Sequence, residues 1–336
     1  TTAAGNGAAN TGGGGGGAGY TTDSTSRLGG TGGSGVVVTS FVQRALTINA
    51  GTGAISVSSA SKLTSLTINS SSTSSSQTSS GVFTGSMNLT IAGTGAFTTT
   101  SNNTYTGSTT VSSGSTLNIQ PSWTSNSNLT GGFVNNGTVN FSSNQSNNGS
   151  TVLFVTNASG SGAWNITSST SGNSIYSNRL DFIGSPTTTG PITVTNYGNF
   201  WTEVTAGTTP VALTSPIYLN GANTVYNLWG VGTIGIGTLT GTGKVDFPSN
   251  GAGSTIALSV GNDNGTGTFS GVISNSGSGG SPTTLSLVKA GTGTQTLSGV
   301  NTYSGTTTVN NGTLAIGGAG LLGSGTYNAT LTVASG

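Results

Sequence analysis

The chain has 336 residues, of which 3% are charged, and six basic and five acidic side chains give it a net charge of +1. Ordinary globular proteins carry about 25% charged residues, and binding to nucleic acid or to an anionic membrane surface needs clustered Lys and Arg. The basic residues lie far apart in the sequence, which excludes both kinds of partner: Arg27, Arg44, Lys62, Arg179, Lys244 and Lys289.

Hydrophobic residues form 31% of the chain, and there are 60 glycines, no cysteine and no histidine. Disordered chains combine low hydrophobicity with high net charge and few β-branched residues, whereas this chain has short alternating runs of Val, Ile, Leu and Thr. A thin β core is therefore favoured. No apolar run approaches the ~18 residues of a membrane-spanning helix. A composition poor in Lys and Glu fits an extracellular bacterial or phage surface protein better than a cytosolic enzyme.

The first 35 residues are rich in Gly, Ala, Ser and Thr, and Gly12 to Gly17 are six consecutive glycines. Such a composition is typical of a flexible linker. The alternative is ordered glycine packing, because chains without Cβ atoms can lie closely side by side, as at the collagen axis. Residues 29–38 are similar to the ends of glycine-rich domains in phage and bacterial surface proteins. In that interpretation the segment is either a cap or a docking element for a neighbouring chain.

From residue 36 to residue 119 apolar and hydroxyl side chains alternate, as in half-buried β-strands. Residues 45–57 predict two strands around a Gly-Thr-Gly turn, and residues 63–69 predict another strand. The run 70–80 is almost wholly polar and predicts a loop that leaves the fold, since it offers nothing to bury.

Residues 120–230 are less regular but keep the same alternation. The Asn-Gly pair within residues 133–141 is a strong turn signal and predicts a hairpin or the corner of a coil. From residue 224 the predicted strands are shorter and recur. No apolar period of 3.6 residues extends over a useful length, so we expect almost no helix.

The stretch from Leu287 to Gly318 occurs twice. Its predicted strands at 294–297, 306–309 and 313–316 are closed by Gly or Asn, which can adopt positive φ. The earlier copy matches it at an offset of 198 (291 − 93 and 301 − 103), and the register then slips by one residue. The matching triplets are Gly93-Thr94-Gly95 with Gly291-Thr292-Gly293, and Asn103-Thr104-Tyr105 with Asn301-Thr302-Tyr303.

Both copies resemble the strand repeat of bacterial autotransporter passengers, whose typical form is G-x-G-T-L-x-L-S-G-x-N-T-Y-S-G-x-T-T-V-x-x-G-T-L. Residues 268–274 are similar to the element that often precedes this repeat. The clear match covers roughly a fifth of the chain. The resemblance implies a right-handed parallel β-helix in a passenger that is displayed on the cell surface or released.

The predicted fold is all-β, a parallel β-solenoid over residues 36–336 with repeat copies near 89–119 and 287–318, preceded by the Gly-rich segment 1–35. Each coil would take ~20–25 residues and stack ~4.8 Å above the previous one. Stacked Thr, Ser and Asn would form hydrogen-bonded rows outside a narrow core of Val, Ile, Leu and Phe. A β-sandwich is the alternative, because many short strands also suit that fold, but sandwiches rarely repeat one strand motif about 200 residues apart.

The sequence offers no set of catalytic residues, and we expect no enzyme and no cofactor. Glycoside hydrolysis needs two carboxyl groups across the scissile bond, and of the five acids only Asp181 and Glu203 lie within about one coil of each other. No histidine or thiol can act as base, nucleophile or metal ligand. No spacing pattern pairs Asp181 with Glu203, and all five acids are interpreted as solvated or singly paired loop residues: Asp23, Asp181, Glu203, Asp246 and Asp263.

Two further motifs are candidate binding sites. Residues 261–265, Gly-Asn-Asp-Asn-Gly, are faintly similar to the calcium loops of nonapeptide repeats, but those need several aspartates in register. Tyr105 and Tyr303 occupy matching repeat positions and are expected to be exposed. Packing at a coil corner is favoured for them over a role in stacking on sugars.

The favoured function is a non-enzymatic extracellular structural protein whose solenoids stack head to tail into a filament. The C-terminal end carries no polar cap, and an uncovered solenoid end exposes unpaired backbone groups. Strand addition between copies would then propagate into a fibre. The residues assigned to this assembly are Gly12, Gly17, Gly32, Val36, Val37, Val38, Leu331 and Val333. The alternative is a monomeric passenger adhesin that binds host surfaces or glycans.

Overall fold

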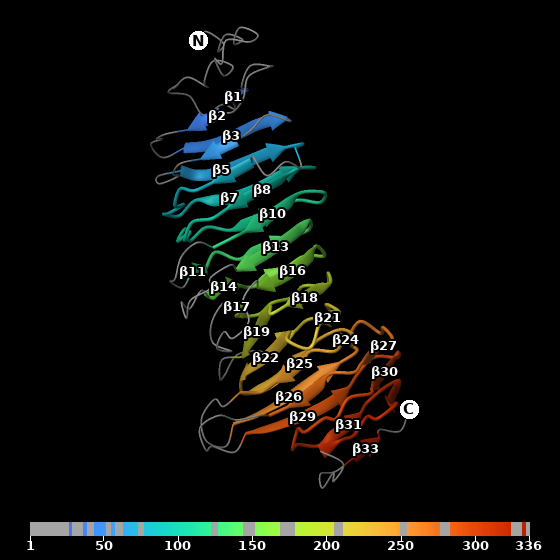
Figure 1. Cartoon of the computed structure of the whole chain (residues 1–336). Helices are drawn as coiled ribbons and strands as arrows, with labels where there is room; N and C mark the ends of the chain where they lie inside the picture. Colours follow the sequence, from blue (N-terminus) through green and yellow to red (C-terminus); the bar gives the residue numbers. More distant parts are fainter. Residues whose placement is uncertain are drawn as a thin grey trace.

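The structure, a computed structural model, describes residues 27–28, 36–38, 44–51, 55–57, 63–72, 77–121, 127–143, 152–168, 179–204, 211–248, 254–275, 283–323 and 331–333. Within these ranges the chain is all-β, with strands β1 to β33 and no helix. Accordingly, these ranges hold no helix long and apolar enough to cross a membrane. The strands stack one above another from the N-terminal to the C-terminal end of a rod (Figure 1).

Every strand pair in the four sheets of the described residues is parallel, and sequence neighbours belong to different sheets. A β-sandwich needs two facing sheets of mainly antiparallel strands, so that alternative is wrong and the β-solenoid is confirmed. The handedness of the coil stays a prediction.

One sheet, here called the continuous sheet, extends along the whole described rod and receives one strand from each coil. Its strands are β2 (Val36–Val38), β4 (Ile55–Val57), β6 (Gln77–Ser79), β8 (Ala96–Thr99), β10 (Thr116–Ile119), β13 (Thr138–Ser143), β16 (Ala163–Ser168), β18 (Ile192–Asn196), β21 (Ile217–Asn220), β24 (Leu239–Gly241), β27 (Gly267–Phe269), β30 (Thr294–Leu297) and β32 (Thr313–Ile316).

Three shorter sheets form the other sides of the coils. The first sheet contains β1 (Arg27–Leu28), β3 (Arg44–Gly51), β5 (Leu63–Ser70), β7 (Asn88–Gly93), β9 (Thr109–Val111), β12 (Phe133–Asn135) and β15 (Ala158–Ser159). The middle sheet contains β11 (Ser127–Leu129), β14 (Val152–Thr156), β17 (Arg179–Ile183), β19 (Asn199–Val204), β22 (Val225–Gly230), β25 (Lys244–Asp246) and β28 (Val272–Ser274). The last sheet contains β20 (Val211–Ala212), β23 (Gly232–Gly235), β26 (Thr255–Val260), β29 (Thr284–Lys289), β31 (Thr307–Val309) and β33 (Leu331–Val333).

The cross-section of the solenoid therefore changes along the rod. Near both ends a coil has a strand in the continuous sheet and one in either the first or the last sheet. Between β11 and β28 the middle sheet adds a strand to each coil, which makes three described strands in every such coil except that of β17 and β18. The larger aromatic side chains of residues 120–230 lie in these three-sided coils, where five rings contact one another in series with centroids 4.9 to 5.1 Å apart: Phe133, Trp164, Phe182, Phe200 and Tyr226.

Strand alternation sorts side chains between the core and the surface. In the continuous sheet, in-register inner positions hold the buried side chains of Leu117, Val139, Trp164, Ile192, Ile217 and Leu239. The outer positions hold amides in a ladder: Asn165 Nδ2 donates to Asn140 Oδ1 at 2.8 Å, and Asn140 Nδ2 donates to Asn118 Oδ1 at 2.8 Å. The predicted rows of hydrogen-bonded polar side chains are present.

The structure corrects one local prediction and decides between the two alternatives of another. The polar run 70–80 is not wholly a loop, because residues 77–79 form β6 and the buried hydroxyl of Ser79 donates to the Val57 carbonyl at 2.8 Å. A hydrogen-bonded hydroxyl thus occupies a buried position of this strand. The Asn-Gly pair at 136–137 makes a coil corner between β12 and β13, which belong to different sheets, and not a hairpin.

Candidate functional site: the outer face of the middle sheet

The two repeat copies have the same internal geometry. Asn103 Oδ1 accepts a hydrogen bond from the Phe83 amide at 2.9 Å, and Asn301 Oδ1 accepts one from the Ile273 amide at 3.0 Å. The asparagine of the repeat therefore satisfies a backbone donor one coil below. In the second copy, Asn301 Nδ2 also donates to two carbonyl oxygens, at 3.0 Å each.

The repeat tyrosines are buried, which corrects the expectation that they are exposed. Tyr105 is 2% exposed and Tyr303 is 1% exposed. Each hydroxyl lies against the threonine four residues later, with 2.6 Å between the oxygens of Tyr105 and Thr109 and 2.7 Å in the second copy. Packing at the corner, the favoured interpretation, describes them, and a sugar could not stack on either ring.

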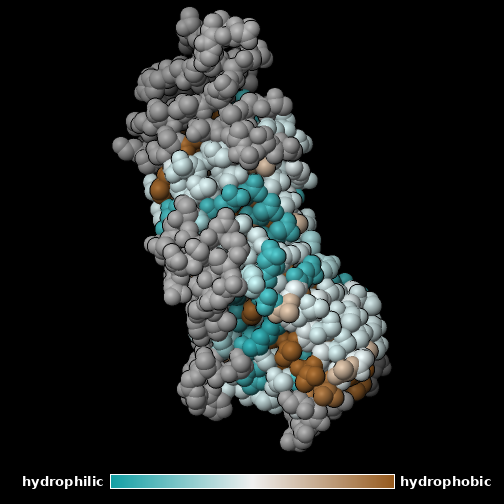
Figure 2. Space-filling model, viewed as in Figure 1, coloured by the Kyte–Doolittle hydropathy of each residue, from teal (hydrophilic) through white to brown (hydrophobic). Residues whose placement is uncertain are grey.

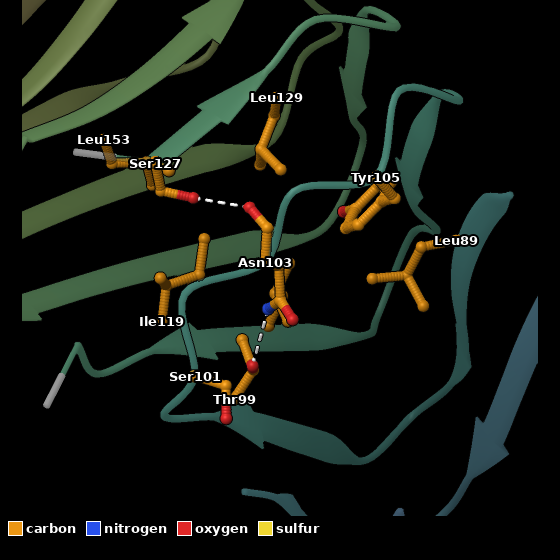
Figure 3. A pocket seen from close by; sticks show the side chains of 10 residues that line it. Leu89, Thr99, Ser101, Asn103, Tyr105, Ile119, Ser127, Leu129 and Leu153 are labelled. Atoms are coloured by element: carbon orange, nitrogen blue, oxygen red, sulfur yellow. Dashed lines mark hydrogen bonds between the residues drawn. The ribbon is translucent and has the colours of Figure 1, made fainter. Parts of the chain in front are cut away.

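A small cavity lies beside the first copy, where the middle sheet begins (Figure 3). Its interior holds about 10 Å³, which is room for about one water molecule. Asn103 and Ser127 line it, but the Asn103 amide already donates to Thr99, and Ser127 already donates to the Asn103 carbonyl. The cavity is therefore an interior packing feature and not a ligand site.

Charged side chains gather on the outer face of the middle sheet. Five of the eleven charged residues of the chain are on this face, in β17, β19 and β25: Arg179, Asp181, Glu203, Lys244 and Asp246. Strand alternation puts them there, because the residues between them, such as Leu180 and Phe182, point into the core. In a chain that is 3% charged this density is unusual.

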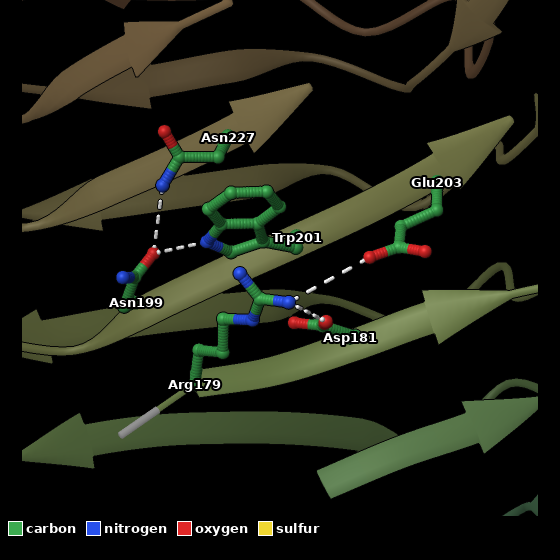
Figure 4. A network of polar contacts seen from close by, with 6 residues as sticks. All are labelled: Arg179, Asp181, Asn199, Trp201, Glu203 and Asn227. Atoms are coloured by element: carbon green, nitrogen blue, oxygen red, sulfur yellow. Dashed lines mark hydrogen bonds and ion pairs between the residues drawn. The ribbon is translucent and has the colours of Figure 1, made fainter. Parts of the chain in front are cut away.

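The Arg179 side chain contacts the carboxyl groups of both Asp181 and Glu203 (Figure 4). Its guanidinium nitrogen Nη2 lies 2.9 Å from Asp181 Oδ2 and 3.7 Å from Glu203 Oε1. The Asp181 side chain is fully buried, whereas 11% of the Arg179 side chain and 25% of the Glu203 side chain are exposed. The three residues form one charged cluster with a buried base and an open rim.

Trp201 lies against the same guanidinium. The Arg179 Cζ atom is 3.9 Å from the ring centroid, a cation–π contact, and the ring also packs against Trp229 with centroids 5.5 Å apart. The indole N–H donates to Asn199 Oδ1 at 2.9 Å, and Asn227 Nδ2 donates to the same oxygen at 2.8 Å. Asn199 thus fixes the orientation of Trp201 from the strand β19 itself (Figure 4).

Further along the face, a second ion pair is built into the sheet. Lys244 Nζ donates to Asp246 Oδ2 at 2.9 Å, and the Ser274 hydroxyl donates to Asp246 Oδ1 at 2.6 Å. Asp246 is 2% exposed, so this carboxylate is neutralised and hydrogen-bonded within the protein. It has a structural role.

Burial raises the pKa of the Asp181 carboxyl well above its ordinary value. The Arg179 charge opposes this shift, and the Glu203 charge adds to it. Raised acids of this kind are found at catalytic sites, but substrate cannot reach Asp181 because the side chain is wholly inside. Asp181 and Glu203 are therefore not arranged like the two carboxyl groups of a glycosidase, which flank the scissile bond of the substrate.

No spacing pattern in the sequence joins Asp181 to Glu203, so their meeting was not expected. The signal that could have revealed the cluster is the alternation of side chains along a strand. Asp181 lies two residues after Arg179, and Glu203 lies two residues after Trp201, so in each strand both residues are on the same face. Two outward positions on adjacent parallel strands meet whatever the length of the chain between them.

The Gly-Asn-Asp-Asn-Gly loop is held by its own hydrogen bonds. The Asp263 carboxylate accepts from Thr238 Oγ1 at 2.9 Å and from the Gly265 amide at 3.0 Å. Nearby, the buried Lys289 ammonium donates to the carbonyls of Ala290, Gly291 and Asn311. No group of three or more possible metal ligands occurs among the described residues.

The predicted assembly residues that the structure describes lie in the strands β2 and β33. Val36, Val37 and Val38 form β2, the first described strand of the continuous sheet, whereas Leu331 and Val333 belong to β33, the last described strand of the last sheet. The Val333 side chain is 69% exposed. Gly12, Gly17 and Gly32 lie outside the described residues.

Comparison with known proteins identifies the repeat. The family model described as the passenger-associated-transport-repeat matches residues 89–119, from within β7 to the end of β10, and residues 287–316, from within β29 to the end of β32. Neither the curated proteins nor the solved structures contain a significant match to the chain. The protein is thus an all-β solenoid that carries two passenger-associated-transport repeats, the repeat of autotransporter passengers.

Proposed function

We propose that this protein is a non-enzymatic, extracellular structural solenoid of the autotransporter-passenger kind. The observation that carries the proposal is that both passenger repeats lie in equivalent coils of one solenoid, with the same buried Asn and Tyr contacts. A fold held by backbone ladders and uncharged side chains, without cysteine, suits export and life outside the cell. The burial of Asp181 and Asp246 supports a structural role for the acids.

Export can be tested by placing the chain between a secretory signal peptide and an autotransporter translocation barrel in a Gram-negative bacterial host. We expect whole cells to display the protein, so that an antibody and added protease reach it without lysis. A variant with Asn103→Leu and Asn301→Leu serves as control, because it removes the side chain that satisfies a backbone donor in each copy. Retention of the unaltered chain in the periplasm would contradict the proposal.

The finer proposal is that solenoids stack head to tail into a filament, and the exposure of the second repeat copy supports it. Ile119 is 4% exposed in the first copy, whereas its counterpart Ile316 is 46% exposed. Val300, Leu321 and Val333 are exposed near the same end, and Figure 2 shows an apolar patch over the C-terminal coils. Exposed apolar patches and open strand edges both favour association.

The strand order suits such stacking. The chain alternates between β29, β31 and β33 in the last sheet and β30 and β32 in the continuous sheet. At the other end β1 lies in the first sheet and β2 in the continuous sheet. The repeat copies make the first and last sheets equivalent sides of the solenoid, since β9 and β31 hold matching residues. A second copy could therefore continue one sheet directly, with its β2 beside β32 or its β1 beside β33. Both pairings cannot form at once, because β1 precedes β2 along the coil whereas β33 follows β32.

Negative-stain imaging and light scattering of the purified chain test the stacking. We expect filaments that disappear when residues 1–35 are removed and when Ile316→Lys puts a charge at the exposed end. Val82→Lys is the matched control, because Val82 is 42% exposed but belongs to a coil near the other end. Unchanged fibres from the truncated protein, or a monomer under all conditions, would contradict stacking and leave the monomeric adhesin.

A further inference from the structure

We propose that the outer face of the middle sheet binds an uncharged pyranose chain at Arg179, Glu203 and Trp229. The inference is independent of stacking, since a single solenoid and a filament subunit present this face alike. It gives the adhesin alternative a defined place on the molecule.

The argument begins with the open rim of the cluster. Glu203 and Trp229 are cross-strand partners in β19 and β22, and both are partly exposed. The Trp229 ring is supported from below by the buried Trp201 ring, which in turn packs on the Arg179 guanidinium. A partly open indole beside a carboxylate and a guanidinium offers a flat apolar surface with hydrogen-bonding groups at its edge.

The cluster also has buried polar atoms without a hydrogen-bond partner. Asn227 Oδ1 is an acceptor that lacks a donor, and Arg179 Nε is a donor that lacks an acceptor. Asp181 and Asn227 are fully buried and flank Trp201 on its two neighbouring strands. Such atoms are costly unless something completes them. A ligand cannot reach the fully buried members of this set, but the accessible edge of the same cluster offers Arg179 as a donor and Glu203 as an acceptor. A sugar hydroxyl both donates and accepts, so a polyhydroxylated ligand fits this edge.

The charge of the cluster narrows the ligand class. Arg179 faces two carboxyl groups, and burial together with the Glu203 charge raises the pKa of Asp181, so this carboxyl stays protonated to higher pH than usual. The Arg179 guanidinium is paired with both carboxyl groups, so the cluster has no net positive charge in either protonation state of Asp181. It has no spare positive charge for the carboxylates of a uronic acid chain. An uncharged pyranose, with an apolar C–H face for the indole and hydroxyls for its edge, matches best.

The ligand would approach from the side of Glu203, because Glu203 is the most exposed charged side chain of the cluster. Asp181 lies beneath the ligand in this arrangement and acts by positioning Arg179. We therefore expect binding without cleavage, because no exposed second carboxyl lies opposite Glu203.

Titration of the full chain with cellohexaose, laminarihexaose and maltohexaose, followed by calorimetry and tryptophan fluorescence, tests the inference. We expect at least one of these neutral hexasaccharides to bind and to change the emission. Trp229→Ala and Glu203→Ala should each weaken binding about tenfold or more, whereas Glu203→Gln should retain most of it because the acceptor oxygen remains. Tyr218→Ala, which removes a half-buried aromatic from the outer face of the continuous sheet, should bind as the unaltered chain does.

Circular dichroism of each variant separates lost binding from lost folding, and Glu203→Ala carries the test if Trp229→Ala does not fold. Absence of binding for all three hexasaccharides at millimolar concentration would overturn the inference. So would equal binding by Trp229→Ala, or a preference for polygalacturonate over the neutral sugars.

Discussion

At the level of single residues, the repeat is defined by side chains that complete hydrogen bonds inside the solenoid. A tyrosine hydroxyl and a threonine hydroxyl meet in the core of each copy, and an asparagine satisfies an amide of the coil below. In a chain with so few charged groups, such uncharged contacts fix the coil register. The Asn-Thr-Tyr triplet of the motif thus has a structural explanation that needs no ligand.

We predict that Tyr105→Phe destabilises the protein by about 1 kcal/mol, because it leaves the buried Thr109 hydroxyl without its tyrosine partner. The double variant Tyr105→Phe with Thr109→Val should recover part of that loss, since both polar partners are then gone. Urea unfolding of the two single variants and the double variant measures the coupling. Strict additivity of the three values would contradict the role assigned to this pair.

Asp181 makes a prediction about pH. Its folded pKa lies above the ordinary value of 3.8, so between the two pKa values the folded state binds more protons than the unfolded state. The free energy of unfolding should therefore fall as pH rises from about 4 through the folded pKa, by about 1.4 kcal/mol for each pH unit that separates the folded from the unfolded pKa. The chain has no histidine to mask this slope.

Unfolding of the unaltered chain and of Asp181→Asn at several pH values between about 4 and 8 tests this. The substitution removes the titrating group, so we expect a flatter profile whatever its effect on absolute stability. Asp246→Asn is the control, because it removes a buried acid of the same sheet. Parallel profiles for the unaltered chain and Asp181→Asn would show that Asp181 has no raised pKa.

At the level of elements, some corner glycines are required by the approach of the next coil. Gly271 does not have positive φ, but a Cβ atom built there would lie 1.8 Å from the Gly243 carbonyl oxygen. One built at Gly299 would lie 1.9 Å from the Gly271 carbonyl oxygen. These three glycines form a column along one corner, and stacking of successive coils leaves no room for a side chain.

Gly271→Ala should therefore destabilise the protein by about 1–3 kcal/mol or more, as overpacking does, although Gly→Ala at an unstrained site usually stabilises. Gly132→Asn is the control, because Gly132 has φ +87° with open space around it, and asparagine tolerates that conformation. Thermal unfolding of both variants measures the contrast. Equal stability of Gly271→Ala and the unaltered chain would show that the coils can separate at this corner.

The sequence predicted the type of element and of fold well, because strand alternation and the repeat are local signals. It predicted the buried repeat asparagines and tyrosines less well, since burial depends on which coil lies above and below. The cluster around Arg179 was missed for the same reason: Glu203 meets it only when two coils stack in register. The strand β6 was missed because its inner side chain is a serine.

At the scale of the whole molecule, each coil contacts mainly the coils beside it. The free energy of unfolding is then approximately a sum over coils and their interfaces, and local unfolding should begin at one end of the rod. The two repeat copies provide a comparison inside one chain. The Thr116 amide donates to the Gly95 carbonyl at 2.9 Å, and the Thr313 amide donates to the Gly293 carbonyl at 3.2 Å. The first copy is covered by β12 and β13 of the next coil, whereas β32 is the last strand of the continuous sheet that the structure describes.

Hydrogen exchange should therefore be markedly faster at β32 than at β10, although their amides make equivalent hydrogen bonds. The physical reason is that β32 can open without breaking a ladder above it, while β10 opens only when its neighbours on both sides do. Mass spectrometry of peptic fragments at micromolar concentration measures this difference. If copies stack through this end, the protection of β32 should rise with protein concentration and should stay low in Ile316→Lys, while β10 remains unchanged in both. Equal protection of β10 and β32 in the monomer would mean that another segment of the chain covers this end, and stacking would then have no open strand to use.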